Sequence, residues 1–432
     1  MQLTSRPGYR WVILALAFLG IFAAAGLSRF GYSAVLPDMQ RALGLTGAQA
    51  GSLASWNLVA YSLMALAGGF LAARFGARKV VTVGMFVTAG GLFATGWVHG
   101  LAEASVYRFL TGLGNGMVMA PSVALLSSWF SPRHRGLASA FASSGTGLGL
   151  VVAGPTVPVL MRASAQDGWR IAWWVFSAVA LFMGILTLLF ERDRPQNVPA
   201  GSLSPVENPK TEKSRTPPGT WSLGPDLRTV LGSLYSWHLG VIYFMYGFSY
   251  LIYYTFFQKR LIADLGVEPT AAGSLFLLAG AASVVGGVLW GAASDRLGRG
   301  TALAQVLTVQ AVASLLFAIR PVTATLVFSA LIFGSAVFSV PGLIGAACGD
   351  RFGSRLAFAS LGFVTVFIGA GQASGPYVGG VFEDLFGSLG PSYLLAAGVA
   401  ALGAVAALFL PDARQKVSGI PARSQTPPEI DR

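Results

Sequence analysis

Charged side chains are scarce in this sequence. Of its 432 residues, 11% are charged and 54% are hydrophobic, whereas a soluble globular chain has about 25% charged residues. Most of the chain therefore cannot face water. Apolar runs of about 20 residues, the length that an α-helix needs to cross a bilayer, return along nearly the whole sequence. The composition predicts an all-α polytopic membrane protein.

Groups that carry redox, metal or covalent chemistry are also few. Cys348 is the single cysteine, so no disulfide can form within the chain, and His99, His134 and His238 lie far apart. The sequence has no phosphate-binding loop of the Gly-x-x-x-x-Gly-Lys-Ser/Thr type, and no nucleophile stands beside a base. A sensor would need a soluble signalling domain, for which the linker and the tail are too short. We expect no enzyme, no cofactor and no metal.

The positive charge follows a pattern that indicates membrane topology. The net charge is +12 and the pI is about 10.1, values that in a soluble domain would suggest nucleic acid. Here Lys and Arg gather in alternate connections between apolar runs, as the cytoplasmic loops of membrane proteins require. We therefore expect contact with the lipid bilayer and not with nucleic acid, a place in the cytoplasmic (inner) membrane, and both termini in the cytoplasm. The apolar run from Trp11 is expected to stay as a membrane segment and not to be cleaved.

Twelve apolar segments are expected to cross the membrane in two sets of six. The first set is 11–36, 47–73, 79–99, 102–126, 136–160 and 169–190, and the second is 231–258, 270–293, 301–319, 322–346, 355–380 and 390–410. The stretch between them is rich in Pro, Ser and charge, which is typical of a flexible linker. We expect an N-terminal half at 1–190, a cytoplasmic linker at 191–230, a C-terminal half at 231–410 and a disordered cytoplasmic tail at 411–432.

A sequence pattern is repeated in the loop after the second segment of each set. The copies run from Gly69 to Lys79 and from Gly291 to Arg299. The second copy, Gly-Ala-Ala-Ser-Asp-Arg-Leu-Gly-Arg, resembles the signature Gly-x-x-x-Asp-Arg-x-Gly-Arg-Arg/Lys of the major facilitator superfamily. The first copy departs from it at Ala73, where the signature has Asp, and at Ala77, where it has a base.

Three further motifs carry the same resemblance over residues 11 to 410. They are the Arg-x-x-x-Gly-x-Gly element at 108–114, the Gly-rich stretch at 371–380 and a weaker relative at 154–155. The resemblance implies two parallel six-helix repeats that expose a central site to each side in turn. The region from Pro121 to Gly145 is similar to monocarboxylate and oxalate porters. The second cation that those relatives hold at mid-membrane has no counterpart in the second set of segments.

Arg29 is the first candidate for binding a solute. It lies roughly 27 Å along a helix that begins at Trp11, in the outer half of the membrane. A charge at this depth costs roughly 2.5 kcal/mol or more, so it must face protein or water. Its guanidinium could pair with an anionic group of the solute. It could equally cap backbone carbonyls or extend to the outer surface.

Coupling to a proton has three candidate residues. The family resemblance implies that Arg108 joins proton movement to transport, although it could also anchor its helix or pair with Asp38 or Glu103. No acidic residue lies in the middle of a predicted segment. A coupling proton would therefore be carried by Asp38 or Glu103 near the outer ends, or by the solute itself. Asn115, on the same helix face as Arg108, could bind the solute or hold helices together.

Aromatic residues are concentrated in the seventh segment. Its tyrosines recur at three- and four-residue steps, and a phenol offers an apolar face with a hydroxyl, which suits an organic solute. Such stripes also serve as packing or as an interfacial belt. The candidate substrate ligands of this kind are Tyr246 and Tyr250, and the further cavity candidates are Trp56, Asn57, Tyr61 and Gln372.

Two groups of residues are assigned to movement and to packing. The charged residues of the repeated loop are expected to form an inner gate: Arg74, Arg78, Asp295, Arg296 and Arg299. Small residues let helices approach closely, and a proline bends its helix. The packing set is Gly112, Gly114, Gly371, Gly375 and Pro376.

These observations predict a secondary transporter, monomeric, that moves a small organic solute by alternating access. The solute is expected to be an organic anion such as a carboxylate. The alternative is a lipophilic drug, multidrug or sugar efflux transporter. The sequence does not distinguish symport from antiport.

Overall fold

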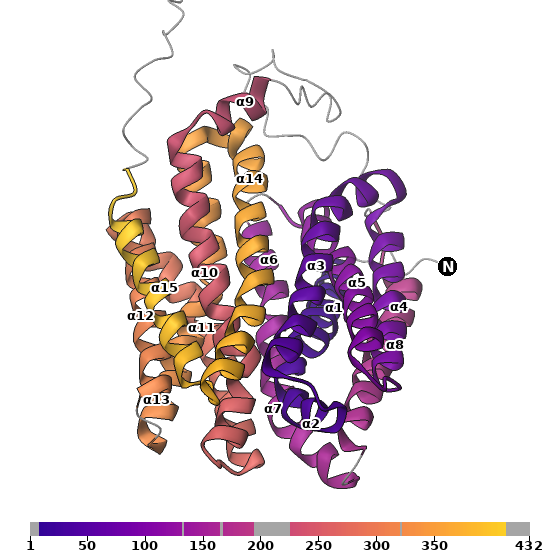
Figure 1. Cartoon of the computed structure of the whole chain (residues 1–432). Coiled ribbons are helices and arrows are strands. Elements are labelled where there is room, and N and C mark those ends of the chain that lie inside the picture. The colour runs from indigo at the N-terminus through magenta and orange to yellow at the C-terminus, as the bar shows by residue number, and fades with distance from the viewer. Residues whose placement is uncertain (1–7, 132–133, 165–166, 194–224, 320–321, 412–432) are drawn as a thin grey trace, which may run out of the picture.

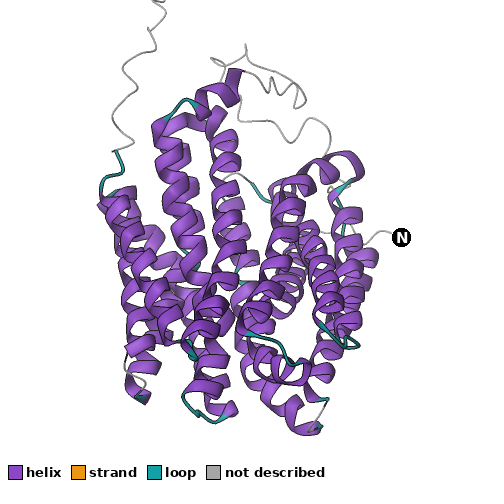
Figure 2. Cartoon of the chain, viewed as in Figure 1, coloured by secondary structure: helices purple, strands orange, loops and turns teal. Residues whose placement is uncertain are grey.

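The structure is a computed structural model that describes residues 8–131, 134–164, 167–193, 225–319 and 322–411. All regular secondary structure within these ranges is helical (Figure 2). All but the first residue of the expected tail at 411–432, and most of the expected linker, lie outside the described residues.

The N-terminal bundle contains six crossings. The first is continuous through α1 (Tyr9–Ile21), η2 (Phe22–Phe30) and α2 (Gly31–Leu43), and the fifth is made of α6 and α7. The remaining bounds are α3 (Gly47–Phe75), α4 (Ala77–Thr95), α5 (Leu101–Trp129), α6 (Arg135–Ser143), α7 (Gly145–Ala163) and α8 (Gly168–Phe190).

The C-terminal bundle repeats this order after the short helix α9 (Pro225–Leu231). Its helices are α10 (Leu234–Lys259) continued by η3 (Arg260–Asp264), α11 (Pro269–Leu297), α12 (Arg299–Ile319), α13 (Thr323–Val337), α14 (Val340–Phe386) and α15 (Gly390–Leu408). Gly353 interrupts α14 with φ 68° and ψ 174°, a conformation that a side chain would strain. In the described ranges, 11 helical segments are long and apolar enough to span a membrane, and the part of α14 after Gly353 supplies the twelfth. The predicted twelve-helix fold is confirmed.

Local sequence signals fix the start of α3. Thr46 and Gln49 form a reciprocal capping box, in which each side chain accepts a hydrogen bond from the other residue's backbone N–H. Gly44, at φ 61°, ends α2 in the left-handed conformation just before this cap. The turn between the first two crossings therefore has only a few residues.

The two bundles stand side by side and meet along pairs of helices (Figure 1). α3 packs against α14, and α7 packs against α11. A Cβ built on Gly51 would lie 2.0 Å from the carbonyl oxygen of Pro376, and one built on Gly154 would lie 2.3 Å from that of Gly273. The backbones of the two halves therefore touch where glycine removes the side chain.

The two ends of the N-terminal bundle lie on the same side. The Tyr9 hydroxyl donates to the carbonyl of Phe190, so the start of the first crossing contacts the end of the sixth. α9, which precedes the seventh crossing, lies at the end of the expected linker. We call this the linker side, and the opposite one, which carries the turn at Gly44, the turn side.

On the turn side of the C-terminal bundle, α10 and α14 extend beyond the ends expected from the sequence. The predicted segments stop at 258 and 380, but α10 with η3 runs to Asp264 and α14 runs to Phe386. The additional turns contain Lys259 and Glu383, which form an ion pair. Arg260 and Asp264 form another at 2.8 Å. The predicted ends at 258 and 380 lie too early because each charge interrupts an apolar run. In the structure, the partner of each charge removes part of the cost of burying it.

Candidate functional site

A cavity of about 740 Å³ lies between the two bundles. Arg29 and Tyr61 line it from the N-terminal half, and Tyr246, Tyr250 and Gln372 line it from the C-terminal half. All five were predicted as substrate ligands, and the structure brings them to one place. This volume is within the range of ligand pockets of small organic molecules.

The cavity opens on the linker side. Leu137 and Phe141 of α6 belong to its lining and are 71% and 51% exposed, and α6 begins just after the linker-side end of α5. On the turn side, α3 and α14 close it with the backbone contact at Gly51 and Pro376. Within the described ranges, the cavity is therefore open on the linker side and closed on the turn side.

Arg29 lies in the π-helical segment η2, at the inner end of the cavity. π-helical turns are often found at functional sites. Its Nη2 donates to the hydroxyl of Tyr250 at 3.2 Å, and its guanidinium lies 4.7 Å from the centre of the Tyr61 ring and 5.2 Å from that of Phe30. Among the described residues no carboxylate pairs with Arg29, and its Nε has no hydrogen-bond partner. Of the residues that the structure describes in the cavity lining, Arg29 is the one that carries a charge.

Tyr250 holds the centre of a polar group that links the halves. Its hydroxyl oxygen accepts from Arg29 and, at 2.6 Å, from Nε2 of Gln372. A phenol has one O–H to donate, and no described residue accepts it. Arg29 and Tyr250 together therefore offer donors to an anionic oxygen in the cavity.

A ladder of tyrosine rings forms the wall beside Tyr250. The ring of Tyr246 stacks on Tyr250 with 4.6 Å between centroids and on Tyr243 with 5.9 Å. The Tyr246 hydroxyl donates to the carbonyl of Val337 at 2.7 Å, so its proton is already used. The ladder gives the cavity a rigid wall with an apolar surface.

Arg108 and Asn57 lie on a separate void of about 20 Å³ beyond Arg29, room for about one water molecule. Nη1 of Arg108 donates to the Ser28 carbonyl at 3.0 Å, and its guanidinium stacks on Tyr32 at 4.6 Å. Nδ2 of Asn57 donates to the carbonyl of Arg108 at 3.0 Å. Both residues are fully buried, so they hold helices together and do not line the large cavity.

Two other predicted ligands lie away from the cavity. Asn115 is buried inside the N-terminal bundle, where it accepts from Thr88 and donates to Ser28, each at 3.3 Å. Trp56 is 48% exposed and packs its ring edge-on against Phe109 on the outside of the bundle. Helix geometry accounts for this position of Trp56, because its neighbours Asn57 and Tyr61 occupy the inner faces of α3.

The acidic candidates for coupling are surface residues. Asp38 pairs with Arg41 at 3.1 Å on its own helix, and its side chain is 37% exposed. Glu103 is 53% exposed and accepts from the backbone N–H of His99 at 2.9 Å. Neither lines the large cavity. Neither pairs with Arg108, whose polar partner is a carbonyl.

The predicted gate residues divide between the two halves. Arg74 is exposed, and the guanidinium of Arg78 donates to the carbonyl of Leu188. Arg299 contacts Asp350 at 2.7 Å within the C-terminal half, and Arg296 is exposed. The side chain of Asp295 lies outside what the structure describes.

The predicted packing glycines lie at helix crossings inside each half. A Cβ on Gly112 would be 2.1 Å from the Asn57 carbonyl oxygen, and one on Gly371 would be 2.3 Å from that of Phe244. A Cβ on Gly114 would lie 2.3 Å from the hydroxyl oxygen of Thr88, and one on Gly375 would lie 2.4 Å from the carbonyl oxygen of Phe248. Pro376 differs, because its carbonyl contacts the other half at Gly51.

Sequence reasoning missed three acidic residues at helix ends. Glu383 and Asp384 end α14 on the turn side, and Asp193 follows α8 on the linker side. Asp193 accepts from the backbone N–H of Arg78 at 2.9 Å, at the start of α4. The first loop copy has Ala73 where the signature has Asp, so the start of α4 has no carboxylate from its own loop. This departure was the sequence signal that a carboxylate from elsewhere in the chain binds there.

Known proteins resemble this chain along most of its length. The family described as "Uncharacterised MFS-type transporter YbfB" matches residues 21–408. The chain is 27% identical over 418 residues to the probable sulfoacetate transporter SauU of Cupriavidus necator, covering 93% of this chain and 94% of that protein. It is 23% identical over 422 residues to the hexuronate transporter of Bacillus subtilis, covering 92% and 93%.

A solved structure shares the fold. The bacterial homologue of the human lysosomal transporter Spinster, in an inward-facing and unoccupied conformation, superposes with a TM-score of 0.70 at 15% identity, covering 93% of this chain and 95% of that one. The family match, the twelve crossings and this structural likeness agree with the family that the sequence motifs resemble. The chain belongs to the major facilitator superfamily and is a membrane transporter, not an enzyme.

Proposed function

We propose that this protein is a secondary transporter that carries a small organic acid across the cytoplasmic membrane by alternating access, with the acid group bound at Arg29. One observation carries the proposal: among the described residues Arg29 is the one charged side chain that lines the large cavity, and none of the described carboxylates neutralises it. Arg29 is partly buried, and a cation in such a place without a countercharge is costly. An anion bound beside it is therefore stabilised electrostatically.

The surrounding groups favour the same class of solute. Tyr250 has an O–H left to donate beside Arg29, and Gln372 fixes the position of its oxygen. A carboxylate can accept from the planar guanidinium and from the phenol together. The names of the relatives, a probable sulfoacetate transporter and a hexuronate transporter, also describe organic anions.

The test measures binding of organic acids to purified protein. A panel of monocarboxylates, dicarboxylates, sugar acids, neutral sugars and cationic drugs is screened by thermal shift, and the dissociation constant of the best ligand is measured for wild type and Arg29→Gln. Loss of a charge-assisted hydrogen bond corresponds to roughly 10- to 150-fold weaker binding. Arg29→Lys keeps the charge but not the planar fork, so we expect an intermediate loss.

Arg10→Gln is the matched control, because Arg10 is exposed, lies outside the cavity and has no predicted role in binding or gating. It should bind the acid as wild type does. Equal affinities in wild type and in a well-folded Arg29→Gln variant would remove the anion site. Binding restricted to lipophilic drugs or neutral sugars would favour the efflux alternative.

A further inference from the structure

The turn-side end of the molecule is closed by contacts between α3 of one half and α14 of the other. A Cβ on Gly47 would lie 2.6 Å from the carbonyl oxygen of Gly380, and one on Gly51 would lie 2.0 Å from that of Pro376. The two helices therefore cross backbone to backbone. For the cavity to open on this side, these two helices must separate.

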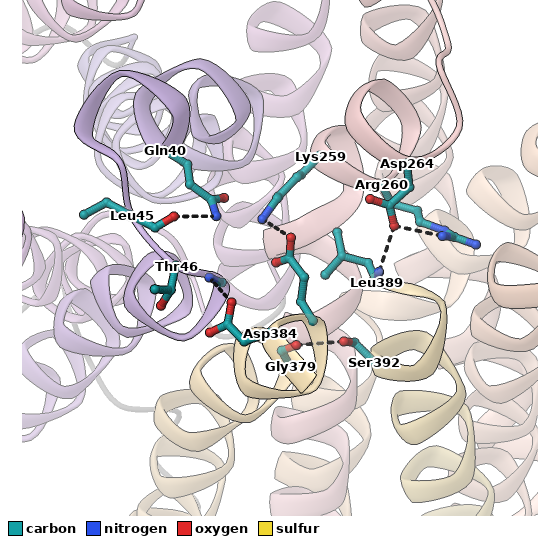
Figure 3. A network of polar contacts seen from close by, with 12 residues as sticks. Gln40, Leu45, Thr46, Lys259, Arg260, Asp264, Gly379, Asp384, Leu389 and Ser392 are labelled. Carbon is teal, nitrogen blue, oxygen red and sulfur yellow. Dashed lines mark hydrogen bonds and ion pairs between the residues drawn. The ribbon is translucent and has the colours of Figure 1, made fainter. Parts of the chain in front are cut away.

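A polar contact lies at the end of the same crossing. The carboxylate of Asp384 lies at the end of α14, beside the chain at Thr46 (Figure 3). It accepts hydrogen bonds from the backbone N–H of Gly47 at 2.6 Å and of Ala48 at 2.8 Å, the first residues of α3. These N–H groups have no partner within their own helix. Asp384 thus acts as a helix cap supplied by the opposite half, and its negative charge faces the positive end of the α3 dipole.

An ion pair holds the end of α14 in place for this contact. Glu383 pairs with Lys259 of α10, whose side chain is 7% exposed. A Cβ on Gly47 would lie 2.7 Å from Oε2 of Glu383 and 2.9 Å from Oδ1 of Asp384. Both carboxylates therefore converge on the first residue of α3, where only glycine leaves room for them.

We propose that Asp384 is the latch that keeps the turn side closed, and that it is released each time the transporter opens there. The contact exists only while α3 and α14 touch. It therefore stabilises the conformation that is closed on the turn side, and it does not stabilise one that is open there. Replacing a capping carboxylate with alanine shifts an equilibrium of this kind by roughly 2- to 30-fold. The ion pair with Lys259 positions the latch and does not itself cross between the halves.

The experiment measures the conformational equilibrium directly. Spin labels are attached to cysteines in a Cys348→Ser background, at Ala42 and Leu385 on the turn side, and in a second sample at Leu137 and Leu297 on the linker side. All four positions are exposed and each pair joins the two halves. In Asp384→Ala the population of long Ala42–Leu385 distances should rise by roughly 2- to 30-fold, and the Leu137–Leu297 distances should shorten.

Two further variants make the result decisive. Gly51→Ala places a methyl against the Pro376 carbonyl and should shift both distances in the same direction as Asp384→Ala, by a different mechanism. Asp38→Ala removes a carboxylate from the same end whose ion pair, within the described part of the chain, is with Arg41 of its own helix, and it should leave both distributions unchanged. Asp384→Asn, which keeps the size and loses the charge, replaces Asp384→Ala if that variant does not fold.

Unchanged distances at both pairs in the folded Asp384 variant would overturn the latch. A shift in Asp38→Ala equal to that in Asp384→Ala would also overturn it, because the effect would then come from surface charge in general. No solute is added in these measurements. The outcome is therefore independent of whether an organic acid binds at Arg29.

Discussion

Tyr250 is the residue whose hydrogen bonds most directly prepare the cavity for an anion. Its hydroxyl accepts from Arg29 and Gln372 and retains its own proton. Tyr250→Phe should therefore weaken binding of the acid by roughly 2- to 12-fold, the effect of one ordinary hydrogen bond. Isothermal titration with the acid found in the binding screen measures this loss.

Tyr246→Phe is the control for that prediction. The Tyr246 hydroxyl donates to Val337 and is not available to the solute. Its loss should lower the melting temperature and leave the dissociation constant unchanged. Equal losses of affinity in the two variants would mean that the tyrosine wall acts through packing and not through the Tyr250 proton.

Glu191 makes the stability of the linker side depend on pH. It follows α8 outside the membrane-spanning segment and is 3% exposed, so burial, with a smaller contribution from Asp193, raises its pKa to about 8. Because the folded state holds the proton more tightly than the unfolded chain, the stabilisation is complete at acidic pH and is lost as the pH rises through about 8. Glu191→Gln should therefore melt above wild type at pH 9 and close to it at pH 5.

The pH series is run against an exposed carboxylate. Glu103→Gln changes a residue that is 53% exposed, and its melting curve should follow wild type at every pH. A Glu191→Gln curve parallel to wild type from pH 5 to 9 would show that the carboxyl does not change its ionisation on folding.

Some glycines lie at close helix crossings and others do not, and the sequence alone does not distinguish the two kinds. In α5, Gly112→Ala would bring a methyl 2.1 Å from the Asn57 carbonyl oxygen, and such overpacking costs about 1 to 3 kcal/mol. In α3, Gly69 has open space around its Cβ position, so Gly69→Ala should stabilise the helix by about 0.5 to 1 kcal/mol. Thermal melts in detergent should move in opposite directions, and a loss of equal size in both would contradict the close crossing.

Sequence patterns predict the crossings well because each one must satisfy its backbone hydrogen bonds within an apolar run of fixed length. They fail at the turn-side ends of α10 and α14. There Lys259 and Glu383 neutralise each other across a long separation in sequence, and no local pattern records this pairing.

The candidate site shows the same limit. Polar or aromatic groups at membrane depth must face protein or water, and this rule allowed the cavity residues to be predicted from the sequence. They are Arg29, Tyr61, Tyr246, Tyr250 and Gln372, and they line one cavity. The same rule selects Asn57, Asn115 and Arg108, but these residues form hydrogen bonds with neighbouring helices and do not line the cavity. Residue type and depth identify both groups, and only the packing of helices separates them.

For the whole molecule, the structure gives one conformation, closed at the turn side and open at the linker side. Which side is the cytoplasm determines whether this is an inward-facing state. The excess of Lys and Arg in the linker-side connections predicts that the linker side is cytoplasmic. The orientation can be measured without knowledge of the solute.

Single cysteines introduced in a Cys348→Ser background test the orientation. Cys348 is the single cysteine of the sequence and is buried, so the variant has no other thiol that could react. A cysteine at Ala42, exposed on the turn side, should react with an impermeant maleimide in intact cells. A cysteine at Arg296, exposed on the linker side, should react only after the cells are permeabilised. The reverse pattern would place the open cavity on the outside, and the latch at Asp384 would then close the path to the cytoplasm.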